Sequence, residues 1–564
     1  MRLTTLATLL TLGACAAPVE DTAPADVVLS NGRVYTLAWS DPDGTGAIAP
    51  DAPFGDQGWH PDAEAIAIRG DRIVRVGSLA QVSELIVPAT RIIDLAGATV
   101  LPGLTDSHSH AIDLGRALAS VDLFGVKDEA EAVARVAAHA AGVPEGEWIV
   151  GRGWDEGAWA NNYPDARLLT RQVPRHPVFL RSLHSFAGWG NALALERAGI
   201  TRHTPAIDGG EIIVDAAGEP TGMLLNRAVE LFERAVPAPT HQQRMTEIEL
   251  ALAQMGRDGF TTIHEAGVDG ASMRAFEALE AAGELPIRVY AMLSVRDVDL
   301  AKVWLARGPD RDAARMLVTR SVKAFYDGAL GSRGARLLDD YSDLPGHRGV
   351  SGDEYGFDEA LVAQLMRAGF QVGVHAIGDL GNRETLNFFQ REFAQTPATA
   401  SLRHRIEHAQ VLHADDLPRF AQLKVIASME PPHAVEDMTW AGDRLGPERV
   451  KGAYAWRSLR RSGAQLTFNA DNPGSDHSIF YGLHAALTRR DKSLEPKGGW
   501  YPEQALTIEE AIRAYTTWSA FAAFRERDAG IIAAGRWADL TVMDIDPFVT
   551  SSSDPGQLLA ATSS

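Results

Sequence analysis

The chain has 564 residues, of which 45% are hydrophobic and 23% charged, a composition typical of a globular protein with a large core. Its 53 basic residues are outnumbered by 74 acidic ones, so the formal net charge is -21. Because nucleic-acid-binding proteins carry a basic face that neutralises phosphates, this balance argues against a nucleic-acid partner. The single cysteine, Cys15, excludes an intramolecular disulfide and a cysteine-based zinc site.

The first 15 residues have the features of an export signal. A positive start at Arg2 is followed by an apolar run over residues 3–12, which is too short to span a bilayer. The letters LGAC, which end at Cys15, match the lipobox at which bacterial lipoproteins are cleaved and acylated. We therefore expect residues 1–15 to be a signal peptide, Cys15 to carry a lipid that anchors an exported protein to the membrane, and residues 16–25 to be a flexible tether. An ordinary secretory signal with a chance cysteine is the alternative.

Short β segments are expected at both ends of the chain. Residues 26–36 and 65–76 each place apolar runs on either side of a turn pair, which predicts two hairpins. Further strands are expected within residues 91–95 and 535–544. The economical interpretation is one small β-sandwich domain, built from residues 26–97 and 528–564, into which a large domain is inserted.

Between these ends, short apolar runs alternate with amphipathic segments such as residues 273–282 and 357–368. The eight predicted strands are residues 99–106, 260–265, 287–294, 321–327, 371–377, 405–410, 425–429 and 466–470. Alternation of strands and helices indicates a parallel sheet, and eight strands favour an α/β fold of the (β/α)8 barrel type over residues 98–527. A doubly wound open sheet is the runner-up, although no Gly-x-Gly-x-x-Gly turn follows the first strand.

About 150 residues separate the first two predicted strands, far more than one crossover needs. We therefore predict an inserted subdomain at about residues 120–245. It contains several tryptophans, among them Trp154 in the sequence Gly-Arg-Gly-Trp-Asp. These rings either form the core of the insert or cover a substrate at the barrel mouth, and in the second case Trp154 contacts the substrate.

Side chains that bind metals end several of the predicted strands. His108 and His110 end the first, and because residues i and i+2 of a strand face the same side, both rings can meet at one ion. His375, His408 and Asp471 follow the same rule at the ends of the fifth, sixth and eighth strands, and Lys323 lies on the fourth. Each of these residues alone is more often structural. Together, at the carboxyl rim where barrel enzymes have their active sites, they predict a metal centre.

With these motifs the chain resembles the amidohydrolase superfamily, and within it the family 3 branch that includes N-substituted formamide deformylase-like enzymes. The resemblance covers nearly the whole length after residue 26. The matching stretches are LPGLTDSHSH (101–110), GRGWDE (151–156), GEPTGML (218–224), GFTTIHEAG (259–267), VKAFYDGALGSRGA (322–335), GFQVGVHAIGD (369–379), RHRIEHAQ (403–410) and GRWADLTVMD (535–544).

The resemblance implies a role for each residue of this centre. His108 and His110 would bind the more buried ion with Asp471, and His375 and His408 the more exposed ion. Lys323 would be carboxylated and bridge both ions in a two-ion centre, and an uncarboxylated lysine beside a single ion is the alternative. One or two divalent ions are expected, with zinc as the default and manganese, cobalt, nickel or iron as alternatives.

The activity implied by the resemblance is hydrolysis of a non-peptide C–N bond in a small molecule, such as a linear or cyclic amide or an N-substituted formamide. A bound divalent ion lowers the pKa of its water towards about 7, and Asp471 would take the proton and pass it to the leaving nitrogen. The ion would polarise the carbonyl oxygen, with His184 or His433 as the candidate to assist it, while Asp327 and Arg333 would contact the substrate. The alternatives are that either histidine caps a loop and that Arg333 is an ordinary surface arginine. The alternatives are an esterase, lactonase or phosphoesterase on the same centre, and an exported metal-binding lipoprotein without catalysis. A second copy of the chain, in a homodimer, is a further expected partner.

Three departures from the family pattern stand out. Glu265 replaces the usual aspartate after the second strand, and Asn469-Ala-Asp471 replaces the more common Gly-Ser-Asp. The Ser-rich segment after residue 547 lacks the usual last sandwich strand, so we expect an open or truncated edge there.

Overall fold

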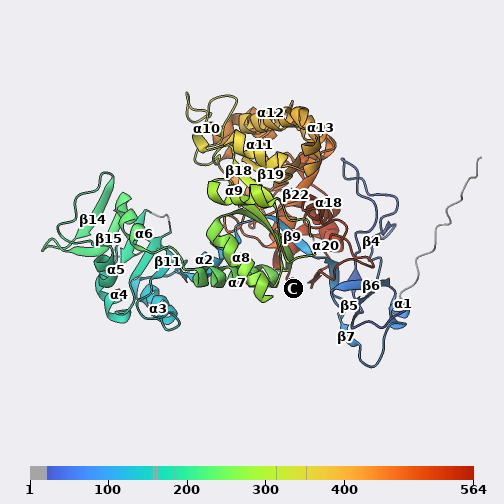
Figure 1. The fold of residues 1–564 in the computed structure, drawn as a ribbon, viewed down its shortest axis with the longest axis horizontal. Helices are drawn as coiled ribbons and strands as arrows, with labels where there is room; N and C mark the ends of the chain where they lie inside the picture. The colour runs from blue at the N-terminus through green and yellow to red at the C-terminus, as the bar shows by residue number, and fades with distance from the viewer. Residues whose placement is uncertain are drawn as a thin grey trace, which may run out of the picture.

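The computed structural model describes residues 22–155, 159, 163–183, 186–312, 314–350 and 352–563. A barrel occupies the centre, with the β-sandwich on one side and the insert on the other (Figure 1). None of the helices in the described ranges is both long and apolar enough to cross a bilayer. Cys15 and the expected export signal lie outside the described residues.

Eight parallel strands form the barrel, and each lies at a predicted segment. They are β9 (Leu104–Ser109), β16 (Phe260–Val268), β17 (Arg288–Ser294), β18 (Leu317–Phe325), β19 (Gln371–Ala376), β20 (Arg405–His408), β21 (Ile426–Met429) and β22 (Leu466–Phe468). They are hydrogen-bonded in chain order from β9 to β22, without the reversal of order that a doubly wound sheet requires. The predicted barrel is therefore confirmed.

The barrel closes between its first and last strands through side chains. Within the described residues, β9 and β22 are the two ends of the hydrogen-bonded sheet. The Ser107 hydroxyl donates to the Phe468 carbonyl oxygen at 2.9 Å, and the backbone N–H of Ala470 donates to the Asp106 carboxylate at 3.3 Å. These bonds hold the segment of β9 that leads to His108 against the segment that carries Asp471.

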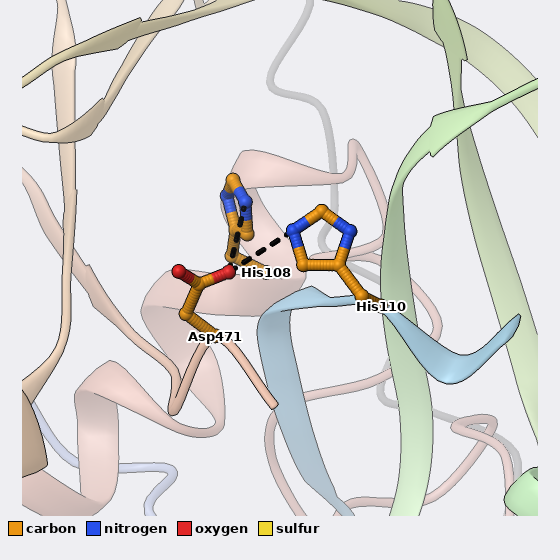
Figure 2. A group of neighbouring side chains, drawn as sticks. All are labelled: His108, His110 and Asp471. Carbon is orange, nitrogen blue, oxygen red and sulfur yellow. Dashed lines mark ion pairs between the residues drawn. The ribbon is translucent and has the colours of Figure 1, made fainter. Parts of the chain in front are cut away.

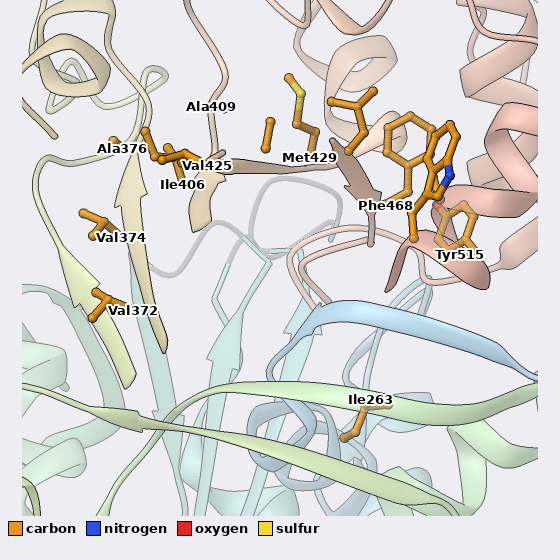
Figure 3. Close-up of a cluster of buried hydrophobic side chains, with 14 of the residues drawn as sticks. Ile263, Val372, Val374, Ala376, Ile406, Ala409, Val425, Met429, Phe468 and Tyr515 are labelled. Carbon is orange, nitrogen blue, oxygen red and sulfur yellow. The ribbon is translucent and has the colours of Figure 1, made fainter. Parts of the chain in front are cut away.

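Strand alternation separates the hydrophobic core from the barrel interior, as β19 illustrates. Val372, Val374 and Ala376 are fully buried in the main hydrophobic cluster (Figure 3). The intervening residues face the interior, where a Cβ added at Gly373 would lie 2.5 Å from the Glu407 carboxylate. His375, two residues further, therefore reaches the same interior space from the end of the strand.

Helices cover the outside of the barrel. They include α7 (His241–Arg257), α8 (Gly270–Ala282), α9 (Val298–Arg307), α11 (Glu359–Arg367), α12 (Asp379–Gln395), α13 (Leu417–Leu423), α16 (Trp456–Arg461), α17 (Ile479–Thr488), α18 (Ile508–Ala514) and α19 (Thr517–Ala522). Local sequence sets their ends, as in α8, where the Asp269 side chain accepts the N–H of Ser272 and Gly283 ends the helix at φ 73°. The predicted helical segments 273–282 and 357–368 fall on α8 and α11.

The sandwich consists of two sheets drawn from both ends of the chain. The four-stranded sheet contains β1 (Val27–Ser30), β5 (Ala65–Arg69), β6 (Arg72–Gly77) and β7 (Arg91–Asp94), and the three-stranded sheet contains β2 (Arg33–Val34), β8 (Thr99–Pro102) and β23 (Leu540–Met543). The second hairpin is confirmed, because β5 and β6 pair antiparallel. The first is wrong: β1 pairs with β5 and β7, whereas β2 pairs with β8, so the turn at Asn31 passes the chain from one sheet to the other.

The first predicted barrel strand, residues 99–106, is divided between two domains. Its first part, β8, pairs with β23 of the sandwich, and only the part after Gly103 enters the barrel as β9. A Cβ at Gly103 would lie 2.1 Å from the Thr261 side chain, so a larger residue could pass from sheet to barrel here only if Thr261 moved.

The C-terminal segment forms helices where the family pattern has a strand. The helix α20 (Pro547–Ser553) buries Phe548, whose ring stacks on Tyr35 at 4.3 Å between centroids. The short helix η5 (Pro555–Ala560) buries Leu558, and Ser563 forms an isolated bridge with Met543 at the edge of β23. The expected open edge is therefore covered by packed chain.

The insert is a mixed sheet with helices on both faces, and it joins the barrel between α2 (Ala111–Ala119) and α7. Its strands are β10 (Val121–Asp122), β11 (Ile149–Trp154), β12 (Val178–Ser182), β13 (Ala187–Gly190), β14 (Gly210–Val214) and β15 (Pro220–Asn226), and its helices are α3 (Glu129–Ala140), α4 (Ala166–Gln172), α5 (Ala192–Arg197) and α6 (Glu230–Ala235). Two hydrophobic clusters of its own stabilise it. Figure 1 shows it projecting away from the barrel.

The tryptophans of the insert lie in its core. Trp154 is fully buried, and its ring lies 5.5 Å from that of Trp159 and 6.1 Å from that of Trp189. Its indole N–H donates to the carbonyl oxygen of Leu180 at 3.2 Å. The prediction that Trp154 contacts a substrate is therefore wrong, because no part of the ring is exposed and its polar atom is already bonded.

We expect Trp154→Ala to lower the stability of the insert by about 3–5 kcal/mol, because it removes a large fully buried ring. Thermal unfolding and limited proteolysis within the insert would measure this loss. The control is Phe186→Ala, since Phe186 lies in the same subdomain but is 64% exposed. Equal stability of the two variants would contradict the assignment of Trp154 to the core.

Candidate metal centre

Two overlapping groups of metal-binding side chains lie at the carboxyl ends of the barrel strands. His108 and His110 form the first group with Asp471, and His408 and His433 form the second with the same Asp471. Within each group the candidate ligand atoms lie within 4.8 Å of one another. Figure 2 shows the two rings of the first group directed at one carboxylate oxygen. Asp471 therefore stands where the two groups meet.

Asp471 is held in its ionised form. Its Oδ1 lies 3.0 Å from His110 Nε2 and 3.6 Å from His108 Nε2. Burial alone would raise the pKa of this carboxyl, but the hydrogen bond from His110 and the nearby histidines outweigh it and hold the pKa well below its usual range. Since the side chains of Asp471 and His110 are 21% and 31% exposed, a small molecule can reach this edge of the centre.

His108 is fixed in the tautomer that binds a metal. Its Nδ1 lies 2.7 Å from the Glu407 carboxylate, while its Nε2 faces Asp471 and lies 2.8 Å from Lys323 Nζ. A neutral ring that donates its Nδ1 proton to Glu407 leaves the Nε2 lone pair for an ion. Burial and the charge of Lys323 both lower the pKa of His108, so the ring stays neutral.

A buried arginine supports that carboxylate. Arg405 donates to Glu407 at 2.8 Å and to the Ser107 carbonyl oxygen at 2.6 Å, and all three residues are fully buried. Sequence analysis assigned no role to Arg405 or Glu407. The signal was present in the letters RIEH, because two charged residues with i, i+2 spacing on a barrel strand share its interior face.

Two of the site residues have unusual backbone conformations. Alternation points Glu407 into the barrel, so the next residue, His408, would ordinarily point outward. His408 has φ 75° and Asp471 has φ 51°, in the left-handed region that non-glycine residues seldom occupy. The Asn469 side chain accepts the N–H of Asp471 at 3.1 Å and helps to hold this turn, which gives the departure from Gly-Ser-Asp a structural role.

Lys323 and His375 complete the interior of the centre. The Lys323 side chain is almost fully buried, and among the described residues no carboxylate lies within ion-pair distance of its Nζ. Burial lowers the pKa of Lys323 to about 8. The His375 ring lies 4.5 Å from that of His408, and its buried Nε2 has no hydrogen-bond partner in the described structure.

Glu430 is a further residue that sequence analysis did not single out. It follows β21 and is 2% exposed, and its Oε2 lies 3.2 Å from His408 Nδ1 and 3.6 Å from His433 Nδ1. Burial lowers the pKa of His408, but Glu430 outweighs burial and raises it. Glu430 therefore places a buried carboxylate behind the second group, as Glu407 does behind the first.

Two residues expected to contact a substrate form hydrogen bonds or ion pairs within the protein. Asp327 is fully buried and accepts the N–H groups of Ile377 and Gly378 at 2.9 and 2.8 Å, so it fixes the loop after β19. Arg333 pairs with both carboxylate oxygens of Asp343 in its own loop. Asp327 also lies 3.8 Å from His375 Nε2, and the Arg333 side chain is 34% exposed, so both substrate contacts remain predictions. His184 lies outside the described residues.

Glu265, which stands where the family pattern has an aspartate, supports the group formed by His108, His110 and Asp471. Its carboxylate accepts the N–H groups of Ala111 and Ile112 at 2.7 and 3.3 Å, at the start of the helix that follows His110. The carboxylate thus satisfies unpaired donors at a helix N-terminus and holds the segment that carries His110.

The residues present fit a divalent ion. The buried Nε2 of His375 lacks a hydrogen bond, and the donor set of imidazole nitrogens and a carboxylate is the one that zinc and similar ions prefer. Buried carboxylates behind His108 and His408 provide the outer shell that orients metal-binding histidines.

Comparisons with known proteins agree with this geometry. The sequence profile described as amidohydrolase family matches residues 91–558. The Bacillus subtilis protein YtcJ is 33% identical over 505 residues, which cover 88% of this chain and 93% of that protein. The N-substituted formamide deformylase of Arthrobacter pascens is 28% identical, with coverage of 86% and 90%.

A solved structure shares the fold over almost its whole length. This structure, an uncharacterized metal-dependent hydrolase from Pyrococcus furiosus, has a TM-score of 0.72 and 28% identity, and the match covers 93% of this chain and 99% of that one. Since the family profile spans most of the sequence, the chain belongs to the amidohydrolase family, whose members are metal-dependent hydrolases.

Proposed function

We propose that this protein hydrolyses a non-peptide C–N bond of a small molecule, such as an amide or an N-substituted formamide. The observation that carries the proposal is the position of Asp471, an ionised carboxylate shared by two histidine groups at the barrel mouth. The likeness to the formamide deformylase of Arthrobacter pascens supports the substrate class.

Each residue of the centre has a place in this proposal. His108, His110 and Asp471 would hold one ion, while His375 and His408 would hold a second, with His433 beside them. Lys323, as its carbamate, would bridge the two ions, and its lack of a carboxylate partner supports that assignment. When bound, such an ion lowers the pKa of water and polarises a carbonyl oxygen. Zinc is the proposed metal, because imidazole and carboxylate ligands suit it.

The protein's own groups would then move the proton. Asp471, ionised and partly exposed, accepts a proton from the attacking water and delivers it to the leaving nitrogen as the C–N bond breaks. His433 is 19% exposed on α14 (Pro431–Asp437) and lies beside His408, where its ring can donate a hydrogen bond to the carbonyl oxygen of the substrate. Glu407 and Glu430 keep the histidines oriented throughout.

We expect Asp471→Asn to reduce turnover by roughly 10²–10⁴-fold, because an amide cannot accept the proton. The test uses zinc-loaded protein with a panel of formamides and linear amides beside matched esters, and the metal content of each sample is measured. Asp71→Asn is the control, since its side chain is 72% exposed in the turn between β5 and β6 of the sandwich. Near-normal turnover in Asp471→Asn, or cleavage of the esters without measurable cleavage of any amide or formamide, would overturn the proposal.

We expect Glu430→Gln to weaken metal binding by about 10–100-fold, because it removes the charge that orients His408. Competition with a chelating zinc indicator would measure the affinity. The matched control is Glu448→Gln, since Glu448 is 82% exposed and pairs with Lys451 at the surface. Equal zinc affinity of the two variants would show that Glu430 does not support the centre.

We also propose that the protein is an exported lipoprotein anchored through Cys15. In a bacterial host, Cys15→Ser should prevent acylation and shift the protein from the membrane fraction to the soluble fraction, because a lipid chain supplies the anchor. Labelling with radioactive palmitate and fractionation would measure both effects, with Ala16→Ser as the control. Membrane association of Cys15→Ser equal to that of the control would contradict the anchor.

A further inference from the structure

A cation held by two aromatic rings lies at the barrel mouth, outside the residues assigned so far. The guanidinium carbon of Arg296, in the loop after β17, lies 3.8 Å from the ring centroid of Phe325 and 5.1 Å from that of Tyr355. Phe325 ends β18, and Tyr355 ends the short helix α10 (Gly352–Tyr355). Three separate segments of the mouth therefore converge on one arginine.

These rings connect the arginine to the metal centre. Phe325 follows Lys323 by two residues, so both side chains share one face of β18, and the Lys323 ammonium lies 5.3 Å from the Phe325 ring. The His375 ring lies 6.1 Å from Phe325 and 6.5 Å from Tyr355. Arg296 is thus one aromatic ring away from a residue of the metal centre.

Arg296 is an exposed cation without a counter-charge. Among the described residues no carboxylate forms an ion pair with it, and its one hydrogen bond, to the Tyr355 carbonyl oxygen, is long at 3.4 Å. Arg307 provides a contrast, because it also lies over a ring, that of Trp304 at 4.1 Å, but pairs with Glu277 at 3.2 Å. The aromatic stacking of Arg296 therefore leaves its charge available.

We propose that Arg296, Phe325 and Tyr355 form a subsite for a carboxylate carried by the substrate, so that the enzyme favours anionic amides. This inference rests on the proposed function and names the substrate class of the same site. Rings that hold the guanidinium plane leave its N–H edge free for bidentate binding of a carboxylate. The same rings provide an apolar wall for the carbon skeleton between the carboxylate and the bond that is cleaved.

The test compares two formamides that differ only in charge. The anionic probe is N-(para-carboxybenzyl)formamide, and its neutral twin is N-(para-carbamoylbenzyl)formamide. With zinc-loaded enzyme, Arg296→Gln should lower kcat/KM for the anionic probe by roughly tenfold to hundredfold, because a charge-assisted pair is lost. For the neutral twin, kcat/KM should stay near wild type. Arg296→Lys should recover part of the loss, since it restores the charge without the planar fork.

The control is Arg307→Gln, which removes an arginine stacked on a ring elsewhere on the barrel and should change neither rate. If Arg296→Gln slows both probes equally, or neither, the carboxylate subsite is wrong while amide hydrolysis stands. If wild type cleaves neither probe, calorimetric binding of the product para-carboxybenzylamine decides. Binding at least tenfold tighter to wild type than to Arg296→Gln would support the subsite and count against the proposed reaction. Equal or absent binding would overturn the subsite.

Discussion

The buried chain from Arg405 through Glu407 to His108 is the interaction on which the metal centre depends. A carboxylate taken out of water is costly, and Glu407 is tolerated because a guanidinium and an imidazole N–H both bond to it. The result is one tautomer and one ring orientation of His108 before any ion arrives. A second buried carboxylate, that of Glu430, lies 3.2 Å from His408 Nδ1. Pre-orientation of this kind removes the entropy that mobile ligands would otherwise lose on binding.

The barrel makes this arrangement possible at low cost to the core. Alternating residues of β19 and β20 divide between an outer hydrophobic cluster and a polar interior, so charged side chains enter the barrel without interrupting the packing of Val374 or Ile406. The exceptions occur where the strands end. Positive φ angles at His408 and Asp471 cost energy, and the surrounding hydrogen bonds and packing sustain them. Strain is thus confined to the rim, where it turns side chains toward the site.

Much of the fold could be predicted because strand periodicity and metal-ligand chemistry are local signals. All eight strands and the convergence of His108, His408 and Asp471 follow from them. Features set by non-local packing could not be predicted in this way. The sequence around Asn31 is typical of a hairpin, yet the two strands that flank it pair with different sheets. The sequence around Trp154 likewise does not indicate whether its ring is buried or exposed, and the fold buries it. Glu430 follows its strand like any loop residue, and only the fold brings it to His408.

Charge explains why a cation at the mouth matters in this protein. The chain has a net charge of -21, and the carboxylates of Glu407, Glu430 and Asp471 surround the centre. The charge of Arg405 is neutralised by its ion pair with Glu407. Carboxylation of Lys323 would convert the other interior cation into an anion. The bound ions would then be the main local positive charge, and they are engaged by their ligands. An anionic substrate approaching such a site would need a separate counter-charge, and Arg296 is a cation beside the centre that no carboxylate of the described chain neutralises.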